Sequence, residues 1–294
     1  MLKGSIVALV TPMQANDNAT LDLKALEALV ELHIASGTNA IVVTGTTGES
    51  ATLNSQEKMA VLATALEIAN GRIPIIAGTG TNSTKTTLEL SCQAIDLGAT
   101  ACLVVTPYYN RPTQHGLYTH YETIAEFVPG PIILYNVPGR TGCDLLPGTV
   151  AKLAKIPNII GIKEAVSDKS RIQELTGIAN ENFSIFSGDD SSALACILHG
   201  ASGVISVTAN IAPKHMATMT TAALEKNTQM AGQINNKLMP LHKALVIASN
   251  PMPIKWALQQ YGLIAGAIRL PLTTLHEEHH AAVLLAMVHA EIEP

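Results

Sequence analysis

The chain has 294 residues, of which 47% are hydrophobic and 14% charged, so it can bury a large core and disorder is excluded. Its net charge of −5 argues against a nucleic-acid-binding protein. The cysteines form no C-x-x-C pair, and the first residues lead into an apolar run rather than a signal peptide, which favours a cytoplasmic protein with reduced thiols. They are Cys92, Cys102, Cys143 and Cys196.

Short apolar runs, each typical of a buried β-strand, recur along the chain and alternate with amphipathic helical patterns. The runs are Ser5–Val10, Ala40–Val43, Pro74–Ala77, Ala101–Val105, Pro131–Tyr135, Ile159–Lys163, Phe183–Ser187 and Gly203–Val207. The clearest helical patterns cover Leu23–Ser36, Ser55–Asn70 and Thr84–Leu97, and a glycine follows each of them. Ser55 is a plausible N-cap for the second helix.

Eight strands that alternate with helices predict a (β/α)₈ barrel over residues 1–224. A doubly wound open sheet is the alternative, but no G-x-G-x-x-G follows the first strand. Residues 225–294 contain no strand pattern and predict a C-terminal helical domain, in which Asn250–Pro253 joins two helices. The uncharged stretch Ser191–Pro213 could span a bilayer by its length, but its polar interruptions favour a buried helix, a turn and a strand.

Polar side chains gather where the predicted strands end, which is where barrel enzymes carry their chemistry. Lys163 ends the apolar run Ile159–Lys163, and burial lowers the pKa of a lysine, which frees its amine to form a Schiff base with a ketone. A lysine that extends its head group into water is the alternative. The other strand ends carry Thr44–Ser50, Thr106–Pro112, Tyr135–Asn136, Pro138–Gly142 and Gly188–Asp190.

Three of these segments have a candidate role beside a structural one. Gly45–Gly48 could hold a carboxylate with its amides and hydroxyls, or form only a tight turn. Tyr135 lies one strand before Lys163, within reach of its amine or adduct, or packs over the barrel end. Arg140 could bind a carboxylate with its two-pronged guanidinium, or remain a solvated loop residue.

One motif near the C-terminus matches a zinc-protease signature by letter alone. The segment His276–His280 reads H-E-x-x-H, in which the two terminal histidines would share a helix face. It lies outside the predicted barrel, among charged residues and without an obvious third ligand. We therefore expect a solvated helix face and predict neither a catalytic metal nor a cofactor.

The strand-end motifs resemble those of the 4-hydroxy-tetrahydrodipicolinate synthase family, long called dihydrodipicolinate synthases, within the class I pyruvate-dependent aldolases. The resemblance covers nearly the whole chain. It is carried by Gly45–Ser50, Thr106–Gln114, Tyr135–Thr141, Gly161–Ala165, Ser187–Asp190 and Asn250–Lys255.

The resemblance implies a barrel enzyme with a C-terminal helical domain, usually a homotetramer built as a dimer of dimers. It implies condensation of pyruvate with L-aspartate 4-semialdehyde in the diaminopimelate route of lysine biosynthesis. It assigns the Schiff base to Lys163 and proton transfer to Tyr135, which would form a hydroxyl relay with Thr46 and with Tyr109 of a neighbouring subunit. Thr46 and Thr47 would bind the pyruvate carboxylate, and Arg140 would bind the carboxylate of the semialdehyde. Gly188 and Ile205 would line the site with backbone groups.

Two other functions remain open at this point. N-acetylneuraminate lyase and the keto-deoxy-sugar acid aldolases share the Schiff-base lysine and the tyrosine, but they lack the form of the loop Pro138–Thr141. A non-catalytic barrel that only binds a keto acid usually loses one of the catalytic side chains, and all of them are present here. A preference for one aldehyde separates the aldolases from one another.

The resemblance also implies an effector site for lysine, and here the chain departs from the sensitive members. Positions that match are Ser50, Ala51, Asn82 and Tyr108. Ser55 and Lys58 replace histidines, and Thr86 replaces the glutamate that pairs with the effector's ammonium. An unpaired cation costs about 2 kcal/mol or more, which is well over tenfold in affinity. Glu57 or Glu89 could compensate, but we expect a site that is degenerate and an enzyme that lysine inhibits weakly or not at all.

Overall fold

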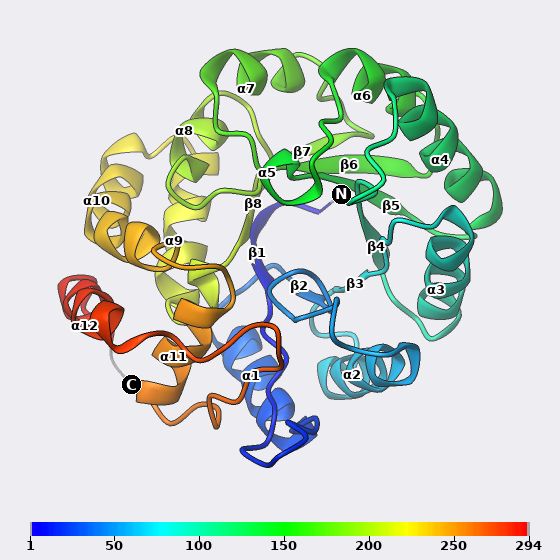
Figure 1. Cartoon of the computed structure of the whole chain (residues 1–294). Coiled ribbons are helices and arrows are strands. Elements are labelled where there is room, and N and C mark those ends of the chain that lie inside the picture. Colours follow the sequence, from blue (N-terminus) through cyan, green and yellow to red (C-terminus); the bar gives the residue numbers. More distant parts are fainter. Residues whose placement is uncertain (1, 293–294) are drawn as a thin grey trace.

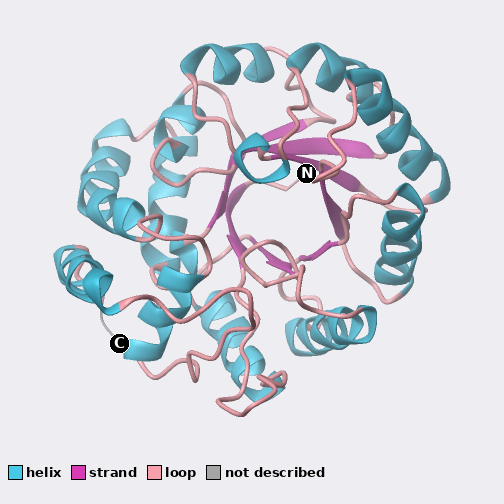
Figure 2. Cartoon of the chain, in the orientation of Figure 1, coloured by secondary structure: helices cyan, strands magenta, loops and turns pink. Residues whose placement is uncertain are grey.

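The computed structural model describes residues 2–292, which form a closed barrel of eight parallel strands inside a ring of helices (Figures 1 and 2). The predicted (β/α)₈ barrel is therefore confirmed. The strands are β1 (Gly4–Ala8), β2 (Ala40–Val43), β3 (Ile75–Gly78), β4 (Ala101–Val105), β5 (Ile132–Asn136), β6 (Ile159–Glu164), β7 (Ser184–Ser187) and β8 (Gly203–Ser206). Each pairs with the next along the chain, and β1 pairs with β8.

The surrounding helices are α1 (Leu23–Ala35), α2 (Ser55–Ala69), α3 (Thr84–Asp96), α4 (Gln114–Phe127), α5 (Pro138–Thr141), α6 (Pro147–Leu153), α7 (Lys169–Thr176), α8 (Ala193–Leu198) and α9 (Pro213–Leu224). Limits were predicted for the first three, and each of these helices begins at the predicted residue and ends one residue earlier than predicted. Ser55 was the wrong N-cap for α2, because Asn54 caps this helix and forms a reciprocal capping box with Glu57. Ser191–Pro213 contains α8 and β8, as expected from its polar interruptions.

Alternation along the strands separates two apolar regions. Side chains directed into the barrel form one cluster: Ile6, Ala8, Ala40, Val42, Ile76, Ala101, Leu103, Ile133, Tyr135, Phe186 and Ile205. The outward-directed side chains, such as Val7 and Ile41, pack against the helices in the larger core. A residue paired with Tyr135 on the next strand therefore also directs its side chain into the barrel.

The last part of the chain is helical, as predicted, and its first helix packs against α9 and α8 (Figure 1). Its elements are α10 (Thr228–Ala244), α11 (Met252–Gln260), the 3₁₀ turn η2 (Glu277–His279) and α12 (His280–His289). Asn250–Pro253 was expected to join two helices, but Met252 and Pro253 already lie in the first turn of α11, where proline is well tolerated. The boundary at residues 224 and 225 stays a prediction.

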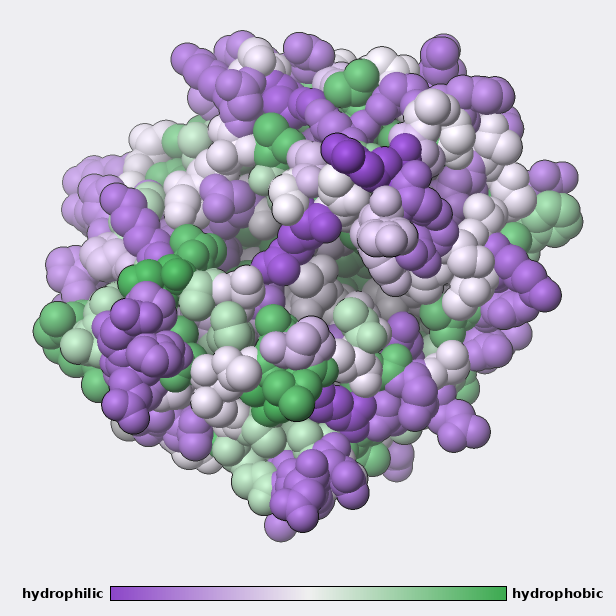
Figure 3. All heavy atoms as spheres, viewed as in Figure 1, coloured by the Kyte–Doolittle hydropathy of each residue, from purple (hydrophilic) through white to green (hydrophobic). Residues whose placement is uncertain are grey.

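Within residues 2–292, no helix is both long and apolar enough to cross a bilayer. Hydrophilic side chains cover much of the outer ring in the view along the barrel (Figure 3). Helix α5 lies across the barrel opening in the same view (Figure 1). It immediately follows β5, so this opening is the carboxyl end of the strands, where the predicted site residues lie.

Candidate active site

Lys163 and Tyr135 face each other across neighbouring strands inside the barrel. They occupy matching positions in the register of β5 and β6, and their exposed fractions are 5% and 6%. The Lys163 amine lies 4.5 Å from the centre of the Tyr135 ring. Among residues 2–292, this amine takes part in no ion pair. A buried amine beside a phenol, with no carboxylate to hold it, is suited to covalent chemistry.

Gly188 leaves room for the lysine side chain. A Cβ at this position would lie 3.1 Å from Lys163 Cε and 3.1 Å from the Glu164 carbonyl oxygen. The Gly188 amide donates a hydrogen bond of 2.6 Å to the same carbonyl oxygen. Ile205, on β8, is 1% exposed and belongs to the inward cluster. Both residues therefore border the interior in which Lys163 lies.

The loop between β2 and α2 carries Thr46 and Thr47. It folds back on itself, because the Ser50 amide donates to Gly45 O and the Glu49 amide donates to Thr46 O. The Thr47 side chain is buried, and its Oγ1 accepts a hydrogen bond of 2.9 Å from Asn250. This loop is thus a tight turn, and it also brings two hydroxyls to the barrel opening.

A cavity of about 360 Å³ opens beside this loop. Its lining includes Thr46, Arg140 and Asn250, which come from the loop after β2, from α5 and from the segment before α11. Arg140 is exposed on α5, and no hydrogen bond within residues 2–292 engages its guanidinium. Lys163 and Tyr135 do not line this cavity; they lie on the strands inside the barrel.

Tyr109 does not reach the barrel interior of its own chain. Its side chain is 90% exposed, and its backbone has a left-handed φ of 74°, which projects it from the loop after β4. Within residues 2–292, no hydrogen bond joins the hydroxyls of Thr46, Tyr109 and Tyr135. One chain therefore brings Lys163, Tyr135, Gly188 and Ile205 together but leaves the predicted relay open.

A buried polar network behind the lysine was not anticipated from the sequence. Asn136 donates to both carboxylate oxygens of Glu164, at 3.1 and 3.0 Å, and to Asp144, at 2.7 Å. Arg171 binds Asp144 at 2.5 Å and lies 3.6 Å from Glu164. Burial raises the pKa of Glu164 to about 7, because it disfavours the charged carboxylate. Hydrogen bonds from Val166 and Asn136 and the positive charge of Arg171 favour the carboxylate, but they offset only part of this effect.

Comparison with known proteins agrees with this geometry. The sequence pattern of the Dihydrodipicolinate synthetase family matches residues 1–290. A 4-hydroxy-tetrahydrodipicolinate synthase of Ectopseudomonas mendocina is 54% identical over 287 residues, which cover 98% of each chain. The chain belongs to the dihydrodipicolinate synthetase family.

Solved members of the family have the same fold. The chloride-inhibited dihydrodipicolinate synthase of Acinetobacter baumannii, solved with pyruvate, aligns over 100% of both chains with a TM-score of 0.97 and 52% identity. The enzyme of Cyanidioschyzon merolae, solved with lysine bound, aligns over 99% of both chains with a TM-score of 0.95 and 34% identity.

Four of the positions that the sequence resemblance assigned to an effector site line the same cavity. Ser50, Ala51, Lys58 and Tyr108 line it. Lys58 is half-buried, and this burial lowers its pKa. The Thr86 hydroxyl donates to Ser83 Oγ at 3.2 Å, so this position supplies no carboxylate. Ser55 begins α2, and the Asn82 carbonyl accepts a hydrogen bond from Asn110.

The two glutamates that could compensate differ in how firmly they are held. Glu57 binds the Arg269 guanidinium through both oxygens, at 2.9 and 2.6 Å. Glu89 lies 3.9 Å from Lys85 on the exposed face of α3. Glu57 is therefore not free to pair with an effector's ammonium, whereas the exposed Glu89 has only this long contact with Lys85.

The histidine-rich segment does not form one continuous helix. His276 precedes the 3₁₀ turn η2, and α12 begins only at His280. The His280 ring stacks on Trp256, with ring centres 4.2 Å apart, and its Nε2 lies 2.9 Å from Leu275 O. His276 and His280 thus lack the shared helix face that the zinc-protease signature requires.

Proposed function

We propose that this protein condenses pyruvate with L-aspartate 4-semialdehyde to give 4-hydroxy-tetrahydrodipicolinate, in the diaminopimelate route to lysine. The observation that carries the proposal is the buried Lys163 amine, free of any ion pair within residues 2–292 and 4.5 Å from the centre of the Tyr135 ring. Membership of the family and the names of relatives more than 50% identical support the same reaction.

The first steps need only an amine and a proton carrier. The neutral Lys163 amine attacks C2 of pyruvate, and loss of water gives an iminium ion. This cation acidifies the methyl group, and removal of one C3 proton gives an enamine. We assign the proton transfers to Tyr135, because its ring lies beside the amine on the next strand.

The enamine carbon then attacks the aldehyde carbon of the second substrate, and the resulting alkoxide takes up a proton. Attack of the semialdehyde's own amino group on the iminium carbon closes the ring and releases the lysine amine. No electrons are gained or lost overall, so no redox cofactor enters these steps.

The substrate carboxylates are assigned to groups at the barrel opening. Thr46 and Thr47 supply hydroxyls for pyruvate, and Gly188 and Ile205 border the interior beside Lys163. Arg140 lines the neighbouring cavity and makes no side-chain hydrogen bond or ion pair within residues 2–292, so its planar guanidinium is available for the carboxylate of the semialdehyde.

Tyr109 is assigned to the active site of a neighbouring subunit, where it completes a hydroxyl relay with Thr46 and Tyr135. Its 90% exposure in one chain supports this assignment, since a large aromatic side chain is rarely left so open without a partner. We propose a homotetramer built from two such dimers. A cytoplasmic location is also proposed, and it is supported by four cysteines that form no disulfide.

The test is a preference assay with pyruvate and a panel of aldehydes. We expect the highest kcat/KM with L-aspartate 4-semialdehyde and much lower values with N-acetylmannosamine and with sugar aldehydes. Preference for a sugar aldehyde would assign the chain to another pyruvate aldolase. Failure to consume pyruvate with any aldehyde, despite binding it, would indicate a non-catalytic keto-acid-binding protein.

A further inference from the structure

The loop that carries Thr46 and Thr47 adopts a backbone that its own residues disfavour. Thr44 and Glu49 both have left-handed φ values, 54° and 56°, although neither is glycine. Such conformations persist only where the surrounding structure holds them, and they concentrate at functional sites. The contacts that hold this loop are therefore informative about its role.

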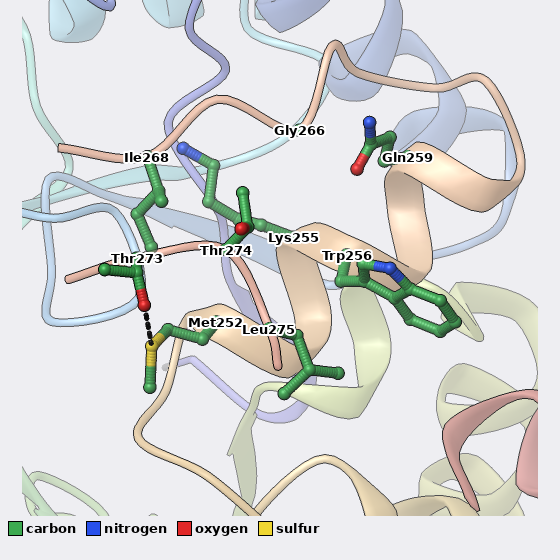
Figure 4. Close-up of a pocket in the computed structure, with 9 residues that line it drawn as sticks. All are labelled: Met252, Lys255, Trp256, Gln259, Gly266, Ile268, Thr273, Thr274 and Leu275. Carbon is green, nitrogen blue, oxygen red and sulfur yellow. Dashed lines mark hydrogen bonds between the residues drawn. The ribbon is translucent and has the colours of Figure 1, made fainter. Parts of the chain in front are cut away.

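One contact is a buried ion pair with the C-terminal helices. The Lys255 amine, on α11, lies 2.5 Å from Glu49 Oε1, and the two side chains are 2% and 1% exposed. Glu49 Oε2 accepts a hydrogen bond of 3.1 Å from the Arg269 amide. Figure 4 shows Lys255 extending from α11 with its amine directed away from Trp256 and Gln259. Both oxygens of Glu49 are thus bound by groups more than 200 residues away in the sequence.

A second contact reaches the substrate-binding hydroxyl itself. Asn250 Nδ2 donates a hydrogen bond of 2.9 Å to Thr47 Oγ1. A hydroxyl carries one donor and two acceptor sites, and a carboxylate only accepts. Because Asn250 occupies an acceptor site of Thr47, the hydroxyl proton remains free to point at a carboxylate. Asn250 also lines the cavity with Thr46 and Arg140.

We propose that Asn250 and Lys255 are positioning residues for the keto-acid subsite, with Asn250 orienting the Thr47 hydroxyl and Lys255 fixing the loop through Glu49. The proposal rests on the proposed function of Thr47 as a ligand of the pyruvate carboxylate. It makes the C-terminal helices a working part of the active site. A purely structural role would leave substrate binding unchanged in every variant that folds.

The test compares pyruvate KM, kcat and melting temperature for Asn250→Ala, Thr47→Val and the double variant. We expect Asn250→Ala to raise the pyruvate KM about tenfold, because the Thr47 hydroxyl, no longer oriented by Asn250, would lose its hydrogen bond to the pyruvate carboxylate; the change in kcat should be smaller. If Asn250 acts through Thr47, the double variant has the same KM as Thr47→Val alone. The proposal would be overturned if the two substitutions raised the pyruvate KM independently, so that their effects multiplied in the double variant. An unchanged KM in Asn250→Ala would also overturn it.

Lys255 requires a variant that does not strand a buried charge. Lys255→Met alone leaves Glu49 unpaired and can unfold the chain. The double variant Glu49→Gln/Lys255→Met removes both charges, and we expect it to fold and to raise the pyruvate KM at least about fivefold. The exposed pair Glu31–Arg72 gives a matched control, because the double variant Glu31→Gln/Arg72→Met should leave KM unchanged. A folded Glu49→Gln/Lys255→Met protein with the normal KM would refute the role of Lys255.

These outcomes are separable from failure of the proposed function. Borohydride trapping of the unaltered protein with pyruvate tests whether a Schiff base forms at all. If the unaltered protein is not labelled, the proposed function fails. If it is labelled and the Asn250 variant binds pyruvate normally, only the positioning role fails.

Discussion

Replacing Glu164 by glutamine should change how stability depends on pH. Glu164 follows Lys163, the residue proposed to form the Schiff base, and is 5% exposed. Burial raises the pKa of its carboxyl from the ordinary 4.5 to about 7 in the folded chain. Between these values the folded protein keeps a proton that the unfolded chain releases. The stabilisation from this group is therefore present below pH 4.5 and is lost as the pH rises to about 7.

The size of the effect follows from the two pKa values. A difference of about 2.5 pH units, from 4.5 to about 7, at roughly 1.36 kcal/mol per unit, gives about 3 kcal/mol. Glutamine can accept hydrogen bonds from Asn136 and Val166 through its oxygen. It is neutral at every pH, so it contributes no pH-dependent stability. The free energy of unfolding of Glu164→Gln, minus that of the unaltered protein, should therefore rise by about 2–3 kcal/mol between pH 5 and pH 8.

Urea denaturation at half-unit pH intervals and one fixed protein concentration measures this difference. Glu174→Gln is the matched control, because Glu174 is an exposed residue of α7, and its difference should stay flat. A flat difference for Glu164→Gln, within about 1 kcal/mol, would show that the carboxyl is already ionised in the fold at pH 5.

Three further predictions concern the active site and its regulation. Inactive Tyr109→Phe and Lys163→Ala chains should regain partial activity when mixed, because a mixed dimer contains one site with both residues; verified exchange without activity would place Tyr109 in its own chain. L-Lysine should inhibit weakly or not at all, because Thr86 supplies no carboxylate and Glu57 binds Arg269, whereas half-inhibition below 1 mM would show that the effector site is intact. Gly188→Ala should lower kcat at least about tenfold, because the new Cβ would lie 3.1 Å from Lys163 Cε, and normal kcat would show that the side chain has room to move.

The barrel could be predicted because its signal is local. Each strand is a short apolar run such as Ala40–Val43, buried on both faces, and each run is separated from the next by a helical pattern. The neighbouring positions of Tyr135 and Lys163 then follow from the order of the strands. Errors fell at the ends of elements: β1 is Gly4–Ala8 rather than Ser5–Val10, Asn54 caps α2, and Pro253 lies inside α11, because adjacent residues compete for the same role there.

The contacts that support the site could not be predicted in the same way. Lys255 and Glu49 are 206 residues apart, and no sequence pattern around either residue indicates that the two side chains form an ion pair. The sequence did offer one signal, since a lysine within the apolar helix Met252–Gln260 needs a buried partner. The raised pKa of Glu164 comes first from its burial, which hydrogen bonds from Val166 and Asn136 and the nearby charge of Arg171 offset only in part, and only the packed structure determines that burial.

The central claim is that Lys163 forms a Schiff base with pyruvate. Incubation with pyruvate followed by borohydride reduction should add one pyruvate-derived mass per chain, and peptide mapping should place it on Lys163. Lys163→Arg, which keeps a positive charge but no reactive amine, should take no label under the same conditions. Label on another lysine, or an unlabelled protein that still condenses its substrates, would contradict the account.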